Sequence, residues 1–213
     1  PSFEAMRIDK NAKDIIQEKA MENRKATSKN KATSKSLLKP TEKKERKTLL
    51  NPADETQIRK LNSHDIKFTN LSKVYWPKEK ITKRDMLNYY YQVAPYILPY
   101  LKNRPQSMNR FPNGINGKSF YFKDVTGTAP DWVETYKYKS DADNRVRNYL
   151  VAKDDASLLY MANLGCIEMN PWHSQIKTED YPDWCVIDLD PGKNSFQQVI
   201  DAANVTKDIL ENM

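Results

Sequence analysis

The sequence has few of the residues that build disulfide frameworks, zinc clusters or membrane spans. Only two of its 213 residues are cysteines and only two are histidines. Cys166 and Cys185 lie in apolar surroundings without a C-x-x-C spacing, so we expect reduced core thiols, as in a cytoplasmic protein. His64 and His173 are too far apart in sequence to predict a zinc cluster. No apolar run approaches the roughly 20 residues of a spanning helix and we find no signal peptide, so no membrane contact is predicted.

The positive charge of the chain is unevenly distributed. The formal net charge is +7, and the segment from Arg24 to Lys47 carries ten lysines and arginines against two glutamates. Residues 21–65 are polar, and the run K-A-T-S-K-N is followed by the near-copy K-A-T-S-K-S. The segment has almost no large apolar side chains whose burial could offset the entropy of ordering. We therefore predict a disordered basic linker there. It is a solvated tether or an arm that contacts DNA, and both interpretations stay open.

From Ile66 onward, strands and helices alternate, which predicts an α/β (α+β) fold. Thr82 followed by Asp85 resembles a capping box at the start of a helix. Pro95 and Pro99 are expected to break that helix and leave a second, short one.

Further elements follow from capping residues and from β-forming runs. Asp155 is expected to cap a helix that closes at Gly165. Ser195 and Gln198 are expected to cap another, and the residues predicted to be buried on it are Val199, Ile200, Ala203 and Ile209. The runs S-M-N-R-F, K-S-F-Y-F-K and C-I-E-M-N-P-W predict short strands.

The stretch P-D-W-C-V-I-D-L-D-P-G, residues 182–192, is the strongest predicted strand, although it contains two carboxylates. Side chains alternate along a strand, so Asp188 and Asp190 would project to the same side, with Cα atoms about 6.5–7 Å apart. A divalent cation such as Mg²⁺ or Mn²⁺ would make that pair tolerable, and phosphoryl or nucleotidyl transfer is the corresponding chemistry. The alternative is structural: Asp190 caps the D-P-G turn and Asp188 lies at a solvated strand end. Phosphatases and nucleotide-sugar transferases also use D-x-D, so the pair alone leaves the choice open.

A series of motifs over residues 66–210 resembles, in the same order, the polymerase domain of bacterial DNA ligase D. The motifs are T-N-L-S-K-V-Y-W-P, I-T-K-R-D with a tyrosine-rich helix, R-P, R-F-P-N-G, S-F-Y-F-K, P-D-W-V, Y-L-V-A-K-D-D-A-S-L-L-Y-M-A-N-L-G and P-D-W-C-V-I-D-L-D-P-G. Residues 1–14 resemble the end of the OB-fold of the ATP-dependent ligase module. We therefore expect the end of that OB-fold over 1–20, the linker over 21–65 and the N-terminal portion of the polymerase domain over 66–213. Because the chain ends within a helical pattern, we interpret it as a piece of a longer protein.

The resemblance implies a fold, a reaction and partners. The fold is a primase-like mixed sheet with flanking helices, incomplete at the C-terminus. The reaction is metal-dependent nucleotide addition at broken DNA ends during end joining, with ribonucleoside triphosphates preferred and two Mn²⁺ or Mg²⁺ ions bound by Asp188 and Asp190. The parent protein would use ATP to ligate the ends and would bind the Ku end-binding ring. Its location would be the bacterial cytoplasm, at the nucleoid during repair. A DNA-end-binding fragment without catalysis is the alternative function.

The resemblance also implies which residues bind DNA. The family residues that bind the 5′-phosphate of a break correspond to Lys73 and Lys83, with Asn70 as a weaker candidate. Two ammonium groups suit a terminal phosphate because they supply several charge-assisted donors.

Two aromatic residues correspond to those that stack near the template base, and sequence-tolerant stacking suits arbitrary ends. They are Phe120 and Tyr121, and Arg110 is expected to contact the DNA backbone nearby. His173 is a possible nucleotide contact or an ordinary loop residue.

The chain departs from its relatives at three places. Many relatives have lysine in place of Asn109 and histidine in place of Asn170, so one basic DNA contact is in doubt. The third metal-binding carboxylate and the triphosphate-binding Ser/Lys/His stretch of the family have no match after Asp190. We therefore expect the isolated chain to be unable to polymerise and to expose apolar surface.

Overall fold

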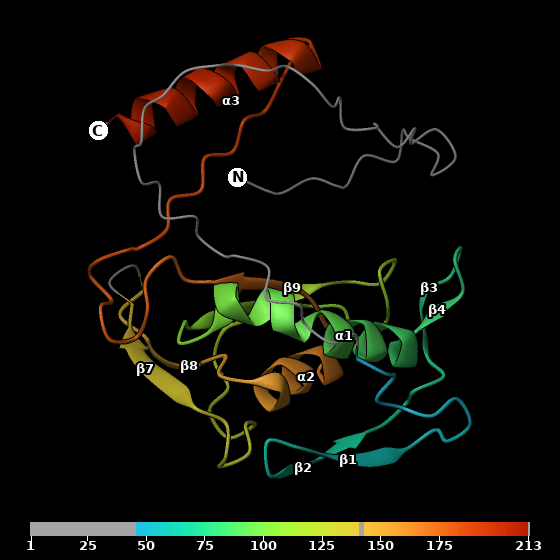
Figure 1. The fold of residues 1–213 in the computed structure, drawn as a ribbon. Helices are drawn as coiled ribbons and strands as arrows, with labels where there is room; N and C mark the ends of the chain where they lie inside the picture. The colour runs from blue at the N-terminus through green and yellow to red at the C-terminus, as the bar shows by residue number, and fades with distance from the viewer. Residues whose placement is uncertain (1–45, 141–142, 213) are drawn as a thin grey trace. The chain divides into compact units, whose positions relative to one another are not determined.

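The computed structural model describes residues 46–140 and 143–212, which form an α+β domain (Figure 1). The expected OB-fold end over residues 1–20, and most of the expected linker, lie outside the described residues. The elements in chain order are β1 (Gln57–Leu61), β2 (His64–Phe68), β3 (Val74–Trp76), β4 (Ile81–Thr82), α1 (Lys83–Leu101), β5 (Gln106–Arg110), β6 (Phe120–Phe122), β7 (Thr135–Lys139), β8 (Val146–Leu150), α2 (Asp155–Asn163), β9 (Cys166–Pro171) and α3 (Phe196–Glu211).

The predicted α+β class is confirmed, but the sheets differ from the single mixed sheet that we expected. Among the described residues the strands form one three-stranded sheet, in the order β6-β5-β9, and three two-stranded sheets, β1-β2, β3-β4 and β7-β8. Every one of these pairings is antiparallel. Most join strands that follow one another in the chain, which short connections permit.

The core lies around the contact between α1 and α2, which pack against each other (Figure 1), and a side chain of β5 belongs to the same buried cluster. Leu87 on α1, Met108 on β5 and Leu158 on α2 are all fully buried. The capping prediction for α1 is confirmed, because Asp85 N donates to Thr82 Oγ1 and Thr82 N donates back to Asp85 Oδ2.

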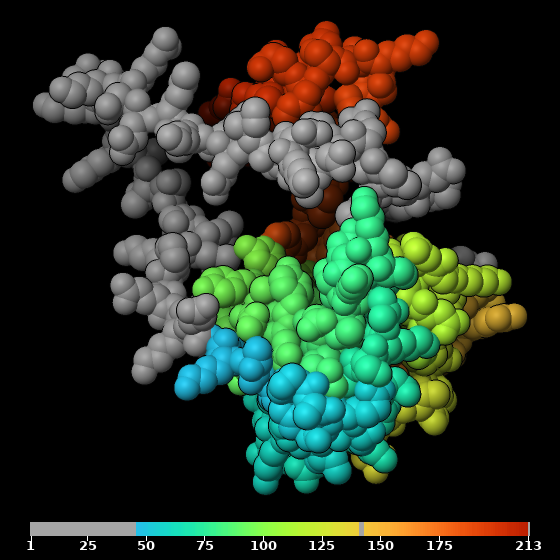
Figure 2. Space-filling view, turned by 90° about the vertical axis from the view of Figure 1, so that its right-hand side faces the viewer, coloured from blue at the N-terminus to red at the C-terminus, as the bar shows by residue number. Residues whose placement is uncertain are grey.

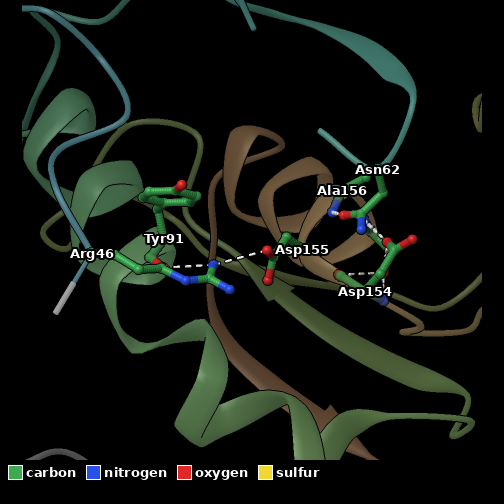
Figure 3. A network of polar contacts seen from close by, with 7 residues as sticks. Arg46, Asn62, Tyr91, Asp154, Asp155 and Ala156 are labelled. Carbon is green, nitrogen blue, oxygen red and sulfur yellow. Dashed lines mark hydrogen bonds and ion pairs between the residues drawn. The ribbon is translucent and has the colours of Figure 1, made fainter. Parts of the chain in front are cut away.

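The folded part begins earlier than the predicted boundary at residue 66. Leu50 and Leu61 are buried in the core, and the blue and cyan residues of Figure 2 pack onto the domain surface. Asn62, in the turn between β1 and β2, accepts a hydrogen bond from Ala156 N at the start of α2, at 3.2 Å (Figure 3). The polar composition of residues 46–65 predicts a linker, but Leu50 and Leu61 lie where they join the core.

Pro95 and Pro99 do not break α1, which runs without interruption from Lys83 to Leu101. A proline in a helix leaves the carbonyl four residues earlier without its N–H donor. For Pro95 that carbonyl belongs to Tyr91, and Arg46 Nη1 donates to it at 3.3 Å (Figure 3). A donor from a distant residue therefore replaces the missing helix hydrogen bond.

Arg46 joins three parts of the domain at once. Its Nη1 lies 2.8 Å from Asp155 Oδ2 at the start of α2, and its guanidinium carbon lies 5.0 Å from the centroid of the Tyr91 ring. Figure 3 shows the side chain lying between the two helices.

Arg46→Ala is expected to destabilise the domain by about 2 kcal/mol, since it removes a charge-assisted hydrogen bond and a cation–π contact. That loss corresponds to a melting temperature lower by roughly 4–8 °C for a domain of this size. Calorimetry or circular dichroism measures it. Lys47→Ala is the matched control, because Lys47 is exposed and has no recorded contact; equal melting of both variants would contradict the role of Arg46.

The segment from Trp184 to Asp190 is not a strand, contrary to prediction. It has no backbone hydrogen bond to a neighbouring segment among the described residues. The nearest such bonds on either side are donated by Asp183 N and by Asn194 N. Strand structure requires a paired neighbour, and the β-forming residues of this segment have none here. Cys185 is accordingly exposed and not a core residue, whereas Cys166 is buried, and both are free thiols.

Helix α3 has the predicted cap, in which Gln198 N donates to Ser195 Oγ, but it has no buried residue. Its four predicted core positions are therefore not buried. The groove beside the helix is apolar and is lined by Ile187, Leu189, Ala203, Thr206 and Leu210, among others. The exposed apolar surface expected of this end of the chain is present, including Phe196 and Val186. At α2, Asp154 is the N-cap residue in place of the predicted Asp155, which begins the helix.

Candidate functional site

Lys83 is a lysine with its charged end buried in the domain. It is the first residue of α1, its exposed fraction is 6%, and its Nζ donates to Thr69 O at 3.0 Å. Burial, together with repulsion from Lys73 and Arg110, lowers the pKa of Lys83 to about 8, and Glu55 opposes that shift. An ammonium group has three donors, and one is used here, so Lys83 keeps donors for an anion.

Lys73 is held beside Lys83 by the backbone. Lys83 N donates to Lys73 O at 2.8 Å, which ties the loop before β3 to the start of α1. Lys73 Nζ donates to Asn113 Oδ1 at 3.0 Å. Asn113 follows β5 and lies inside the R-F-P-N-G motif, whose pattern by itself does not indicate a role for this side chain.

Asn70 has a structural reason to be asparagine. Its φ is +55°, a left-handed conformation that asparagine tolerates better than most residues. Lys73 N donates to Asn70 O at 3.2 Å and closes the turn. The expected contact of Asn70 with the phosphate stays a prediction. The Asn70 side chain is exposed, and Lys73 lies on the same turn.

Gly114 fixes the turn that carries Asn113. Its φ is +81°, and a Cβ at this position would lie 2.8 Å from Tyr75 O. Ile115 N donates to that same carbonyl at 2.8 Å. The turn therefore approaches β3 more closely than any side chain at position 114 permits.

Gly114→Ala is expected to lower the free energy of unfolding by roughly 1–3 kcal/mol, through a strained φ and a backbone clash. Denaturant titration measures it. Gly127→Ala is the matched control, since its φ of +69° is similar but an added Cβ would meet nothing within 4 Å. The clash argument fails if the two substitutions have equal effects.

Arg110 connects the lysine pair to the aromatic residues of β6. Its Nε donates to Leu164 O at 2.8 Å, and its guanidinium carbon lies 5.2 Å from the ring centroid of Phe120 and 4.8 Å from that of Phe122. Burial lowers the pKa of Arg110, but an arginine keeps its charge at any physiological pH. The residue thus holds the Phe120 ring and adds positive charge near Lys83.

Phe120 and Tyr121 are both exposed, at 42% and 54%. Neighbours on a strand face opposite sides, so a core strand would bury one of them. Their pairing is with Arg110 and Asn109 of β5. Two exposed aromatic rings on one short strand provide surfaces on which bases can stack.

Asn109 is largely buried, and its amide is engaged within the sheet. Its Nδ2 donates to Glu168 Oε2 at 2.8 Å, and its Oδ1 has no hydrogen-bond partner. It does not supply the positive charge that a lysine would at this position. Asn170 Nδ2 donates to Ser107 O at 3.1 Å, on the neighbouring strand.

Asp188 and Asp190 are exposed, and neither has an ion pair with any described residue. Asp190 Oδ1 accepts a hydrogen bond from Gly192 N at 3.0 Å, as the turn-capping alternative expects. Among residues 46–140 and 143–212, no group of three or more Asp, Glu, His or Cys residues is placed to hold a metal. Two exposed carboxylates with one residue between them and no ion pair nevertheless fit Mg²⁺, which proteins often bind through one or two carboxylates, with waters and substrate phosphates completing the shell.

His173 lies on a loop that a buried arginine holds. Arg104, 3% exposed, donates from Nη1 to His173 O at 2.6 Å and pairs with Asp183 at 2.7 Å. Asp183 N donates to His173 O as well. The imidazole itself is exposed, so its expected nucleotide contact stays a prediction. Arg104 was not selected from the sequence, although the R-P motif contains it.

The structure thus brings Lys73, Lys83, Arg110 and Phe120 into one neighbourhood. No recorded interaction joins Asp188, Asp190 or the His173 ring to that group within the described part of the chain. Glu55 is the acidic residue that acts on Lys83, whose pKa it raises. Lys73, Lys83 and Arg110 outweigh this carboxylate, so the group is positively charged and suits an anion.

Comparisons with known proteins agree with the motifs. A family model described as LigD, primase-polymerase domain matches residues 82–213. The bifunctional non-homologous end joining protein LigD of Bacillus subtilis is 34% identical over 148 residues, which are 69% of this chain and 23% of that protein. The multifunctional non-homologous end joining protein LigD of Mycolicibacterium smegmatis is 25% identical over 153 residues, 70% of this chain and 20% of that protein.

The family model covers more than half of the chain and describes a primase-polymerase domain. The chain belongs to the LigD primase-polymerase family, as the motifs predicted. A solved structure of the polymerase domain from Mycobacterium tuberculosis ligase D in complex with DNA is 25% identical with a TM-score of 0.49, over 52% of this chain and 38% of that chain. The chain spans about a fifth of the length of the curated relatives. Among the described residues, no helix has the length and apolar character needed to cross a membrane.

Proposed function

We propose that this chain is the DNA-end-binding part of a LigD-type polymerase that adds nucleotides, preferably ribonucleotides, at broken double strands. The observation that carries the proposal is the buried ammonium of Lys83, which donates to Thr69 O and has no ion pair among the described residues. Lys73 lies beside it, and Arg110 links it to the exposed aromatic strand β6. A buried cation without an internal counter-ion is costly unless an anion binds to it.

The terminal 5′-phosphate of a broken strand fits this site by charge. A phosphate monoester carries about −1.5 to −2 charges at neutral pH, more than a phosphodiester inside the strand. Lys73 and Lys83 together can donate several charge-assisted hydrogen bonds to it, with Asn70 close by on the same loop. Asn113 Oδ1 accepts a hydrogen bond from the Lys73 ammonium, and that bond would break when a phosphate binds.

The aromatic strand would hold the DNA next to the phosphate. Phe120 and Tyr121 offer ring faces to bases of any identity, at about 1–3 kcal/mol per stacked base. The Arg110 guanidinium lies over the Phe120 ring and would bring a positive charge toward the DNA backbone.

Asp188 and Asp190 are the residues that would hold two Mg²⁺ or Mn²⁺ ions, because both carboxylates are exposed and free of ion pairs. Such ions supply charge stabilisation to an in-line nucleotidyl transfer from a nucleoside triphosphate. The chain itself would supply the carboxylate oxygens of Asp188 and Asp190, with one residue between them. The turn that Asp190 caps ends this segment. His173 is the candidate contact of this chain to the nucleotide.

Lys73→Ala and Lys83→Ala are each expected to reduce the preference for 5′-phosphorylated DNA about tenfold or more, since a hydrogen bond to a charged group is worth roughly 1.5–3 kcal/mol. The measurement is the ratio of affinities for gapped DNA with and without the 5′-phosphate, made on the complete natural protein. Affinity for duplex without the phosphate should change little. Lys60→Ala is the matched control, because Lys60 is an exposed residue of β1. An unchanged ratio in both variants would remove the two lysines from the site.

A function in DNA-end binding without catalysis is the second candidate. It is favoured by one observation, which is that no third carboxylate joins Asp188 and Asp190 within the described residues. A primer-extension assay separates the two candidates, because only the first predicts metal-dependent extension by the complete natural protein.

The remaining parts of the proposal concern the longer protein. They are ATP-dependent ligation of the extended ends, contact with Ku, and repair by non-homologous end joining at the bacterial nucleoid. They rest on family membership and on the names of the curated relatives, which are non-homologous end joining proteins.

A further inference from the structure

The first described residues, Arg46–Glu55, form an arm that reaches from the two helices to the loop carrying Lys73. At one end Arg46 lies between α1 and α2. In the middle, Leu49 N and Leu50 N both donate to Asn88 Oδ1 on α1. The arm is therefore bound to the domain along its length, although its composition predicted a linker.

The last residue of the arm contacts the lysine loop directly. Glu55 Oε2 accepts a hydrogen bond from Ser72 N at 2.8 Å, and Glu55 O accepts one from Leu71 N at 3.3 Å. Hydrogen bonds from the Ser72 side chain and backbone hold the pKa of Glu55 below its ordinary value, so the carboxylate is charged at neutral pH.

The opposite side of the same loop is bound to the start of α1. Lys83 N donates to Lys73 O, and Arg84 N donates to Leu71 O at 3.0 Å. Lys83 Nζ donates to Thr69 O. Residues 69–73 thus lie between α1 and the arm, and Arg84 Nη2 joins these two supports by donating to Asp54 O at 2.8 Å.

We propose that Glu55 is a positioning residue for recognition of the DNA 5′-phosphate, because it holds the loop of residues 69–73 so that Lys73 and Lys83 point their ammonium groups at one anion. The inference rests on the proposed function. Glu55 accepts no hydrogen bond from either lysine in the structure, so it acts through the backbone of Ser72. Nothing in the phosphate-binding motif indicates this residue, which precedes that motif and lies in the segment that composition assigned to the linker.

Loss of the Glu55 carboxylate has opposite expected effects on DNA binding if Glu55 supports the loop or if it acts only through its charge. Removing a negative charge near a cationic site should strengthen the binding of any DNA, whether or not it carries a 5′-phosphate. Loss of the loop support should instead weaken the preference for the phosphate and leave binding of unphosphorylated DNA nearly unchanged. Glu55→Ala tests both effects at once.

The experiment measures affinities of the complete natural protein for gapped DNA with a 5′-phosphate and with a 5′-hydroxyl. Glu55→Ala is expected to reduce the ratio of the two affinities about tenfold, the range for a lost hydrogen bond to a charged acceptor. Glu55→Gln is expected to keep the ratio within about twofold, because the amide oxygen still accepts from Ser72 N. Glu79→Ala is the control for charge, since Glu79 is exposed on the β3–β4 turn and has no recorded contact.

The proposal is overturned if Glu55→Ala keeps the wild-type ratio, or if Glu79→Ala lowers the ratio equally. If Glu55→Ala does not fold by circular dichroism, Glu55→Asp carries the test, because it keeps the charge and shortens the reach to Ser72; an unreduced ratio in that variant overturns the proposal as well. Failure of the proposed function looks different, because the wild-type protein itself would then show no preference for the 5′-phosphate.

Discussion

Alanine in place of Asp188 or Asp190 is expected to reduce metal-dependent nucleotide addition by the complete natural protein at least about 100-fold. Even residues that only support metal ligands typically cost 10–100-fold in affinity or activity when they are replaced, and these two would be ligands themselves. The two carboxylates are exposed and make no ion pair among the described residues, and Asp190 only caps an exposed turn, so their removal should leave the stability of the domain almost unchanged. Primer extension with Mn²⁺ or Mg²⁺ measures the activity.

Direct metal binding provides a second readout for this prediction. Electron paramagnetic resonance of Mn²⁺ titrated into the protein should show weaker binding in both variants. Asp180→Ala is the matched control, since Asp180 is an exposed carboxylate of the preceding segment without recorded contacts. Extension and Mn²⁺ binding at the wild-type level in the Asp188 and Asp190 variants would exclude the pair as the metal site.

The preference for a 5′-phosphorylated end is expected to decline steeply above pH 8. The pKa of Lys83 is lowered to about 8 by burial and by its positive neighbours, so the group loses its charge as the pH rises past that value. The phosphate, whose second pKa is about 6, is fully charged throughout this range. Each pH unit above the pKa should then reduce the contribution of Lys83 up to about tenfold.

Lys83→Arg is the control for this pH dependence, because a guanidinium stays charged throughout. The variant should show a flatter profile between pH 7.5 and pH 9.5, even if its affinity differs. Equal slopes for both proteins would contradict the assignment of the decline to Lys83.

The stability of the DNA-free protein should respond to pH in the opposite direction. The pKa of Lys83 is about 8 in the folded protein against an ordinary value of 10.5, so the unfolded chain binds more protons between these two pH values. Stability then rises with pH across that window through this group. Comparing wild type with Lys83→Met by denaturant titration isolates the contribution.

Local sequence determined several elements because their causes lie within a few residues. The capping pairs at Thr82 and Ser195 depend on side chains three positions apart, and both formed as predicted. The free thiols and the family were also available from the sequence, the latter because its motifs occur in a fixed order.

Predictions failed where a residue far along the chain decides the local structure. Pro95 stays within α1 because Arg46, which precedes it by 49 positions, donates to the carbonyl that the proline leaves open. The run from Trp184 to Asp190 has strand-forming residues but no paired neighbour among the described residues, so β propensity alone did not make a strand. Helix α3 likewise has its predicted cap but no buried face.

The sequence by itself determined the family and the caps of α1 and α3. Only the tertiary structure decided that Lys83 is buried, that Glu55 supports the loop beside it and that residues 46–65 belong to the domain. Hydrogen-bond capping depends on neighbours in sequence, whereas burial and the pKa shift that it causes depend on which distant groups exclude water from a side chain.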